Sequence, residues 1–255
     1  SNPRISYDPL HAIATRATAK STRFFGLLAP TVIRIQRQIP RAVLRMNRRV
    51  LVVLGLVVLA ALILSGLSPH DRLTWLMEVA PILVAAPVLA YTRRTFPLTT
   101  LLYVLIAVHA LVLILGGAYT YARVPFGFWL QDVFNLTRNP YDKIGHFMQG
   151  FVPALIAREV LLRGNYVAKG RMVGFLAICI AMTISAVYEL IEWWAALSLG
   201  QGADEFLGTQ GDPWDTQSDM FLALIGASLA LVGFARIQDR QIDEIALDGH
   251  LRDAD

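Results

Sequence analysis

Charged residues and cysteines are scarce in this 255-residue sequence. Only 16% of the residues are charged, whereas 55% are hydrophobic and the mean hydropathy is +0.51. Since about a quarter of an average soluble domain is charged, the composition argues against an ordinary cytoplasmic enzyme, a disordered protein and a nucleic-acid-binding module. The single cysteine, Cys179, lies in an apolar stretch, so no intrachain disulfide framework is possible. The composition predicts an integral membrane protein.

Six stretches are long and apolar enough to cross a bilayer, which takes roughly 20 residues per helix. They predict an all-α, polytopic membrane bundle of about six transmembrane helices. The spans run from Val50 to Leu67, from about Leu73 to Tyr91, from about Leu98 to Tyr119, from Ile144 to Leu162, from Val173 to Trp193 or beyond, and from about Asp219 to Ala235. The first apolar run begins at residue 50 and is too long for the apolar region of a signal peptide, so we expect no cleaved leader.

Basic residues are unevenly distributed between the two ends of these spans. Lys and Arg near span ends stay on the cytoplasmic side of a membrane. Ten of the 23 basic residues precede Val50, and most of the others fall in the same set of alternate loops. We therefore expect a multi-pass protein of the bacterial inner membrane with both termini in the cytoplasm.

The same distribution divides the chain into three parts. Residues 1–49 form a basic, partly amphipathic cytoplasmic segment, residues 50–235 form the transmembrane domain, and residues 236–255 form a short polar cytoplasmic tail. The first segment is either a positive-inside anchor or a surface that also contacts anionic lipids. It has too few aromatic residues to indicate a nucleic-acid partner. Membrane lipids are the expected partners, and the oligomeric state stays open.

Acidic residues gather at the predicted outer ends of the last three spans. Between Met172 and Ala235 there are seven acids and no Lys or Arg. Three pairs of polar residues are spaced i, i+4 or i, i+3, so each pair projects from one side of its helix. The pairs are Asp142 with His146, Glu189 with Glu192, and Asp215 with Asp219. Because unpaired charges beside lipid are costly, we expect the pairs to converge on one outward-facing site.

Several carboxylates with one imidazole suit a divalent cation, and the sequence does not choose among Mg²⁺, Mn²⁺ and Zn²⁺. The candidate metal ligands are Asp142, His146, Glu192, Asp215 and Asp219. The candidate catalytic residues are His146 and Glu189, and the alternative for Glu189 is a protonated hydrogen-bond partner. Asp142, Asp212 and Asp215 have an alternative role in capping helix N-termini.

Four other polar residues lie within the spans. Glu78 enters from the outer side and is placed to lean toward the acidic residues. His109 stands alone near the midplane, where a hydrogen bond to a neighbouring helix competes with a proton-relay role. We expect Arg158 to reach the inner interface, beside Glu159.

Three strings around these residues resemble the bacterial YjdF-type inner-membrane family. They are Tyr141-Asp142-Lys143-Ile144-Gly145-His146-Phe147, Tyr188-Glu189-Leu190-Ile191-Glu192-Trp193, and Gly208-Thr209-Gln210-Gly211-Asp212-Pro213-Trp214-Asp215 with Asp219-Met220. More distantly, the pattern is similar to the VanZ-like family, with Glu192 where that family has Gln and Ala223 where it has Asn. The YjdF-type resemblance implies an inner-membrane protein without a settled activity. The VanZ-like one implies a link to the cell envelope and, by association, to lipid-linked chemistry.

Three functions are compatible with the sequence. The first is a metal-dependent membrane enzyme acting on an envelope lipid or a lipid-linked substrate. The second is a non-catalytic scaffold with a structural polar network. The third is an ion- or proton-coupled transporter that uses Glu78, His109 and Glu189 as relay steps. No hydrolase motif selects the first of these functions.

Overall fold

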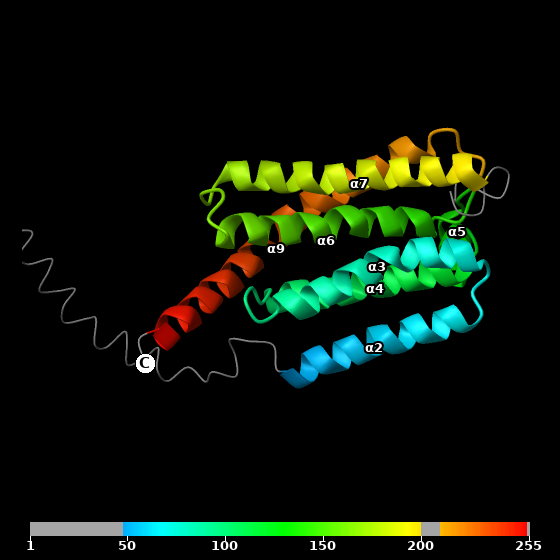
Figure 1. The fold of residues 1–255 in the computed structure, drawn as a ribbon. Helices are drawn as coiled ribbons and strands as arrows, with labels where there is room; N and C mark the ends of the chain where they lie inside the picture. The colour runs from blue at the N-terminus through cyan, green and yellow to red at the C-terminus, as the bar shows by residue number, and fades with distance from the viewer. Residues whose placement is uncertain (1–47, 200–209, 254–255) are drawn as a thin grey trace, which may run out of the picture. The chain divides into compact units, whose positions relative to one another are not determined.

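The computed structural model describes residues 48–199 and 210–253. The prediction of an amphipathic segment at residues 1–49 therefore lies almost entirely outside the described residues. All regular structure in the described ranges is helical, which confirms the predicted fold class. The helices are α2 (Arg48–Leu67), α3 (Arg72–Thr92), α4 (Thr100–Tyr119), α5 (Pro125–Phe134), α6 (Tyr141–Arg163), α7 (Arg171–Leu199) and α9 (Asp215–Asp253) (Figure 1).

Each predicted span coincides with one long helix. Five of these helices, α2, α3, α4, α7 and α9, are both long and apolar enough to cross a membrane. The sixth, α6, has 23 residues and is about 35 Å long at 1.5 Å per residue, which exceeds a bilayer core of about 30 Å. It is less apolar because its polar side chains face other helices rather than lipid. Many of them are buried, including Asp142, His146, Arg158 and Glu159.

The helix starts follow local sequence signals. Asp71 is the N-cap of α3, and its Oδ1 accepts a 2.7 Å hydrogen bond from the backbone N–H of Thr74. This bond stabilises the charged carboxylate and lowers the pKa of Asp71. At the same end of the α3–α4 pair, where the backbone N–H of His70 donates a 3.0 Å hydrogen bond to the carbonyl of Ala118, Thr120 and Tyr121 take positive φ angles, so the chain turns sharply after α4.

The backbones of α6 and α9 approach each other closely at two glycines. A Cβ placed on Gly150 would lie 1.8 Å from the carbonyl oxygen of Ala223, and one placed on Gly226 would lie 2.1 Å from that of Phe147. Small residues continue the contact as Ala154, Ala181 and Ala227 form a buried cluster. Such small residues allow membrane helices to pack backbone to backbone. This crossing sets the distance between side chains that α6 and α9 present to each other.

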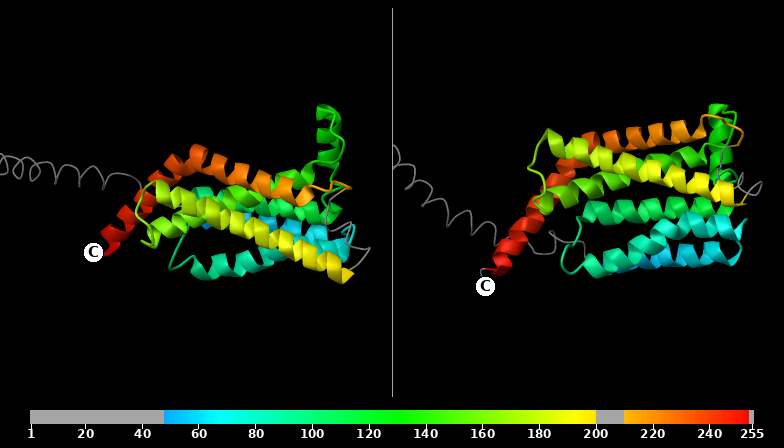
Figure 2. Two further views of the ribbon diagram at one scale, coloured as in Figure 1. Left: turned by 90° about the horizontal axis from the view of Figure 1, so that it is seen from above. Right: turned by 45° about the horizontal axis from the view of Figure 1, so that its top comes forward.

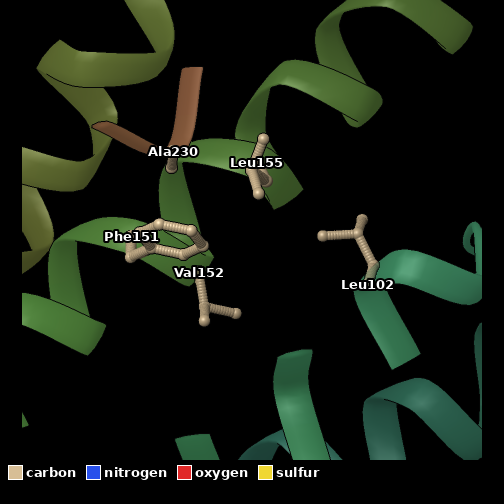
Figure 3. Packing of buried hydrophobic residues seen from close by; sticks show 5 residues of the cluster. All are labelled: Leu102, Phe151, Val152, Leu155 and Ala230. Atoms are coloured by element: carbon tan, nitrogen blue, oxygen red, sulfur yellow. The ribbon is translucent and has the colours of Figure 1, made fainter. Parts of the chain in front are cut away.

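An apolar layer fills the bundle between this crossing and the end of α6. Leu102, Phe151, Val152, Leu155 and Ala230 pack together from α4, α6 and α9 (Figure 3). Leu102 and Leu155 are fully buried. The layer separates the start of α6 from its end.

A polar network ties the helices together beyond this layer, where α6 ends. Glu159 is fully buried; its Oε1 accepts hydrogen bonds from the Thr99 N–H at 3.0 Å and from Arg163 at 2.8 Å. Arg158 is also buried and donates to Gln238 at 2.9 Å and Asp239 at 2.6 Å. The expectation that Arg158 reaches the interface was therefore wrong. The reason is that α9 continues past Ala235 to Asp253 and supplies partners inside the bundle.

Candidate functional site

The predicted pairs on α6 and α9 meet at the end of the bundle where both helices begin. Asp142, His146 and Asp219 each offer one ligand atom, and these three atoms lie within 4.8 Å of one another. His146 Nε2 is 3.5 Å from Asp142 Oδ1 and 3.8 Å from Asp219 Oδ2. All three side chains are buried. Asp142 and His146 share a face of α6 because they are four residues apart, and the close α6–α9 crossing brings Asp219 opposite them.

The other ring nitrogen of His146 faces α7 and its own helix. Nδ1 lies 3.0 Å from Gln149 Oε1 and 3.6 Å from Glu189 Oε1. In the neutral tautomer that carries its proton on Nδ1, this nitrogen donates to Gln149 and Nε2 keeps its lone pair. That lone pair then points toward Asp142 and Asp219. This is the arrangement in which a histidine binds a metal through one nitrogen while the other is held by a hydrogen bond.

Two buried oxygens at the site have no hydrogen-bond partner among the described residues. They are Asp142 Oδ2 and Glu189 Oε1, both on residues that are less than a tenth exposed. Nearly all buried carboxylate oxygens in proteins are hydrogen-bonded or bound to a metal. Two such oxygens, one on each side of His146, have acceptor capacity that a proton, a water or a cation could use.

Two basic residues partly neutralise the α9 side of the site. Lys143 Nζ lies 2.8 Å from Asp215 Oδ1 and 2.7 Å from Asp219 Oδ1. Arg138 lies 2.6 Å from Asp215 Oδ1 and 3.1 Å from Asp212 Oδ2. Partial burial disfavours the charged form of Arg138, but its hydrogen bond to Asp215 and the negative charges of Asp215 and Asp212 together outweigh this effect and raise its pKa.

These ion pairs correct the expectation that the acids at this end of the bundle are unpaired. Lys143 was visible as the residue next to Asp142, but nothing in its spacing showed that it reaches α9. Asp215 is engaged by both cations, so Lys143 and Arg138 compete with any metal for its oxygens. Its assignment as a metal ligand stays a prediction.

Glu192 is buried, but it does not belong to the group of Asp142, His146 and Asp219 whose ligand atoms lie within 4.8 Å of one another. Its strongest charged neighbours are Glu189, His146 and Asp142. Its role as a ligand also stays a prediction. Glu78 on α3 is buried beside the same group, and its Oε2 accepts a 3.0 Å hydrogen bond from the Tyr188 hydroxyl.

The three acids with an alternative capping role differ in what their side chains contact. Asp142 lies in the first turn of α6, where Pro140 is the N-cap and the side chain of Asn139, not that of Asp142, accepts the N–H of Tyr141. The Asp142 carboxylate is turned toward His146 instead. Asp212 accepts a 2.9 Å hydrogen bond from the Trp214 N–H just before α9, a local turn that leads into the helix. Asp215 lies in the first turn of α9 and complements the helix dipole there.

These features define a class of protein: a helical integral membrane protein with a buried carboxylate and histidine site at one end of its bundle. A family model described as "Predicted membrane protein (DUF2238)" matches residues 50–240. The inner membrane protein YjdF of Escherichia coli (strain K12) is 60% identical over 186 residues, which cover 73% of this chain and 89% of that protein. No solved structure matches the chain. The chain belongs to the DUF2238 family and is a multi-pass inner-membrane protein of the YjdF type, which confirms the resemblance in its sequence. The VanZ-like resemblance stays a prediction.

Proposed function

We propose that Asp142, His146 and Asp219 bind a divalent cation at the outer end of the bundle, where the cation serves chemistry on an envelope lipid or a lipid-linked substrate. The observation that carries this proposal is the trio of ligand atoms within 4.8 Å, flanked by the unpartnered oxygens of Asp142 and Glu189. A carboxylate, an imidazole and a second carboxylate are donors that Mn²⁺ and Zn²⁺ accept, and Mg²⁺ takes the carboxylates.

The charge balance of the site favours a cation. Six acidic residues are buried at this end of the bundle: Glu78, Asp142, Glu189, Glu192, Asp215 and Asp219. Arg138 and Lys143 both form ion pairs with Asp215, and Lys143 also pairs with Asp219. A buried carboxylate without a counter-charge costs several kcal/mol, on the order of the total stability of a domain. Either protons or a cation must therefore offset the remaining charge, and the unpartnered oxygens supply ready ligands for a cation.

Within this proposal each side chain has a distinct role. A bound divalent cation would polarise a phosphoryl or ester oxygen and make a bound water more acidic. Glu189 would accept a proton, since its Oε1 is unpartnered and lies 3.6 Å from His146. Gln149 orients the His146 ring through Nδ1. Lys143 holds Asp219 from the side away from His146, because the two bind different oxygens of that carboxylate.

A transporter is the less favoured function because the polar groups do not form a path across the bundle. The apolar layer around Leu155 lies between the site and the network of Glu159. His109, one of the relay steps that this function would use, is half-buried, and its buried Nε2 has no hydrogen-bond partner among the described residues. A scaffold is favoured by the ion pairs of Lys143, which stabilise the helix starts without any ligand.

Metal binding by the purified full-length protein tests the cation directly. We expect about one equivalent of Mn²⁺ or Zn²⁺ to remain after equilibrium dialysis of the wild type, and none with His146→Ala or Asp219→Asn. The matched control is Asp132→Asn, which removes an exposed acid on α5 and should bind as the wild type does. Equal metal content in wild type and His146→Ala would contradict the proposal.

The substrate class is tested separately in cells that lack the gene. We expect the lipid and lipid-linked fractions of the envelope to change on deletion and to return with the wild-type gene but not with Glu189→Gln. Full restoration by Glu189→Gln, in a protein that still binds metal, would remove Glu189 from the chemistry and leave the metal site standing. An unchanged envelope in the deletion strain would favour the scaffold.

A further inference from the structure

The short helix α5 was not predicted from the sequence and has no role in the site. Three of its apolar side chains are spaced i, i+3 and i+7, which places them on one face. They are Phe126, Trp129 and Val133, which are 48%, 56% and 55% exposed. The rings of Phe126 and Trp129 stack at 5.6 Å between centroids, so the face presents a joined aromatic surface. Soluble surfaces rarely expose such a patch without a partner.

The orientation of α5 identifies that partner. Both views of Figure 2 show α5 running across the direction of the long helices, at the end of the bundle where α6 begins. Because the long helices cross the membrane, α5 lies along the membrane plane. Its ten residues extend about 15 Å, too short to span a bilayer. A short helix with an aromatic face in this orientation is typical of helices that lie in the lipid headgroup boundary.

Exposed tryptophans from other parts of the chain occur at the same end of the bundle. Trp193 and Trp194 lie near the end of α7, and Trp214 immediately precedes α9. All three are more than half exposed. Tryptophan is enriched where membrane meets water, so these side chains and Trp129 mark one interface from three parts of the chain. A lipid boundary accounts for all of them together, whereas a protein partner at α5 would account only for α5.

We propose that α5 is an interfacial helix whose Phe126, Trp129 and Val133 insert into the headgroup boundary of the leaflet that holds the carboxylate and histidine site. The helix is fixed to the start of α6 through Asn139, whose Nδ2 donates to the Val124 carbonyl at 3.0 Å and whose Oδ1 accepts from the Tyr141 N–H at 3.0 Å.

This attachment carries the membrane position of α5 over to the site. Asp142 follows Tyr141 directly, so the insertion of α5 places the site near the depth of lipid headgroups. Insertion of α5 does not require a metal at the site.

Site-directed spin labelling of the full chain tests this placement. Cys179→Ala gives a background without cysteine, because Cys179 is the single cysteine. Labels are placed one at a time at residues 126, 129 and 133, with residue 132 as the matched control on the same helix but off the aromatic face. The proteins are reconstituted in vesicles of phosphatidylethanolamine and phosphatidylglycerol. Collision with oxygen, which partitions into lipid, is compared with collision with a water-soluble nickel chelate.

We expect oxygen to dominate at residues 126, 129 and 133 and the nickel chelate to dominate at residue 132. Equal access of the nickel chelate to all four labels would overturn the proposal. Spin–spin broadening at residue 129 would place a second copy of the chain on this face and would also overturn it. If a label prevents reconstitution, quenching of tryptophan fluorescence by brominated lipid is compared between the wild type and Trp129→Phe. Headgroup-level insertion predicts a smaller quenched fraction in Trp129→Phe, and an unchanged fraction contradicts it.

Discussion

Substituting Gly226 with Ala tests whether the α6–α9 crossing holds the site together. The new Cβ would lie 2.1 Å from the carbonyl oxygen of Phe147 and 3.1 Å from the backbone N of Phe151. These are backbone atoms of a packed helix, so they cannot rotate aside as a flexible side chain would. For the shortest contact to reach 3.0 Å, below which real Cβ atoms essentially never come, the two helices must separate by about 1 Å.

The cost follows from two opposing effects. Forcing an extra carbon into a packed contact destabilises by about 1–3 kcal/mol, while replacing a mid-helix Gly by Ala favours the helix by about 1 kcal/mol. A backbone contact allows little relief, so the packing effect wins and a net loss of about 1–2 kcal/mol is expected. The same separation moves Asp219 from His146, because His146 precedes Phe147 on α6 and Asp219 lies two turns before Gly226 on α9. Metal affinity should therefore fall together with stability.

Unfolding of the purified protein in mixed micelles, with increasing denaturing detergent, measures the loss. The control is Gly233→Ala on the same helix, where nothing lies within 4 Å of the added Cβ. We expect Gly233→Ala to be as stable as the wild type or slightly more stable, and to bind metal normally. If Gly226→Ala matches Gly233→Ala in both measurements, the close crossing does not set the geometry of the site.

Four further predictions concern single side chains. Lys143→Met should destabilise the chelator-treated protein by about 2–3 kcal/mol, because Asp215 and Asp219 lose their shared cation, and added Mn²⁺ should restore most of the melting temperature; no recovery would argue against a nearby metal. Glu192→Gln should reduce the metal-dependent rise in melting temperature if its charge helps to hold the cation, whereas equal rises in variant and wild type would remove Glu192 from the site. Asp71→Ala should cost about 1 kcal/mol near pH 7, and Asp71→Asn much less, because both Asp and Asn cap helices well. Since the pKa of Asp71 is lowered in the folded protein, its contribution is fully present above the unfolded value of about 3.8 and is lost as the pH falls through the folded pKa; a penalty for Asp71→Ala that stays constant down to pH 2 would contradict this. Thr137 and Gly170 are both exposed and lie at opposite ends of the bundle. A cysteine introduced at residue 137 should react with an impermeant reagent added from outside, and one at residue 170 should not; the reverse pattern would place the site on the cytoplasmic face.

The long helices were predictable because lipid imposes a strict rule on sequence. A span must satisfy its backbone internally and present apolar side chains, so each leaves an apolar run of the right length. α5 was not predicted because its ten residues are too few for a membrane span, so it leaves no apolar run of the required length. The continuation of α9 to Asp253 was missed for a similar reason, since its later turns are polar.

The error at Arg158 shows how one missed element propagates to another. Snorkelling assumes that a long basic side chain at a span end finds only lipid and water around it. Here α9 continues beside the end of α6 and presents Gln238 and Asp239, so Arg158 is buried with two hydrogen-bond partners instead. Without the length of α9, hydropathy gave no means of choosing between these outcomes.

The candidate site shows where periodicity stops being informative. The i, i+4 spacing on α6 put Asp142 and His146 on one face, and the structure keeps them 3.5 Å apart. The same spacing on α9 put Asp215 and Asp219 together, but it did not show that Lys143 would bridge them. Spacing fixes which residues share a face, whereas the rotation of each helix about its axis decides which faces meet. That rotation is set by the glycine contacts of α6 and α9, so Asp219 offers one oxygen to Lys143 and the other to His146. Lys143 thus neutralises Asp219 through one oxygen while the other oxygen faces His146, and under the proposed function it is beside His146 that a cation would balance the charge.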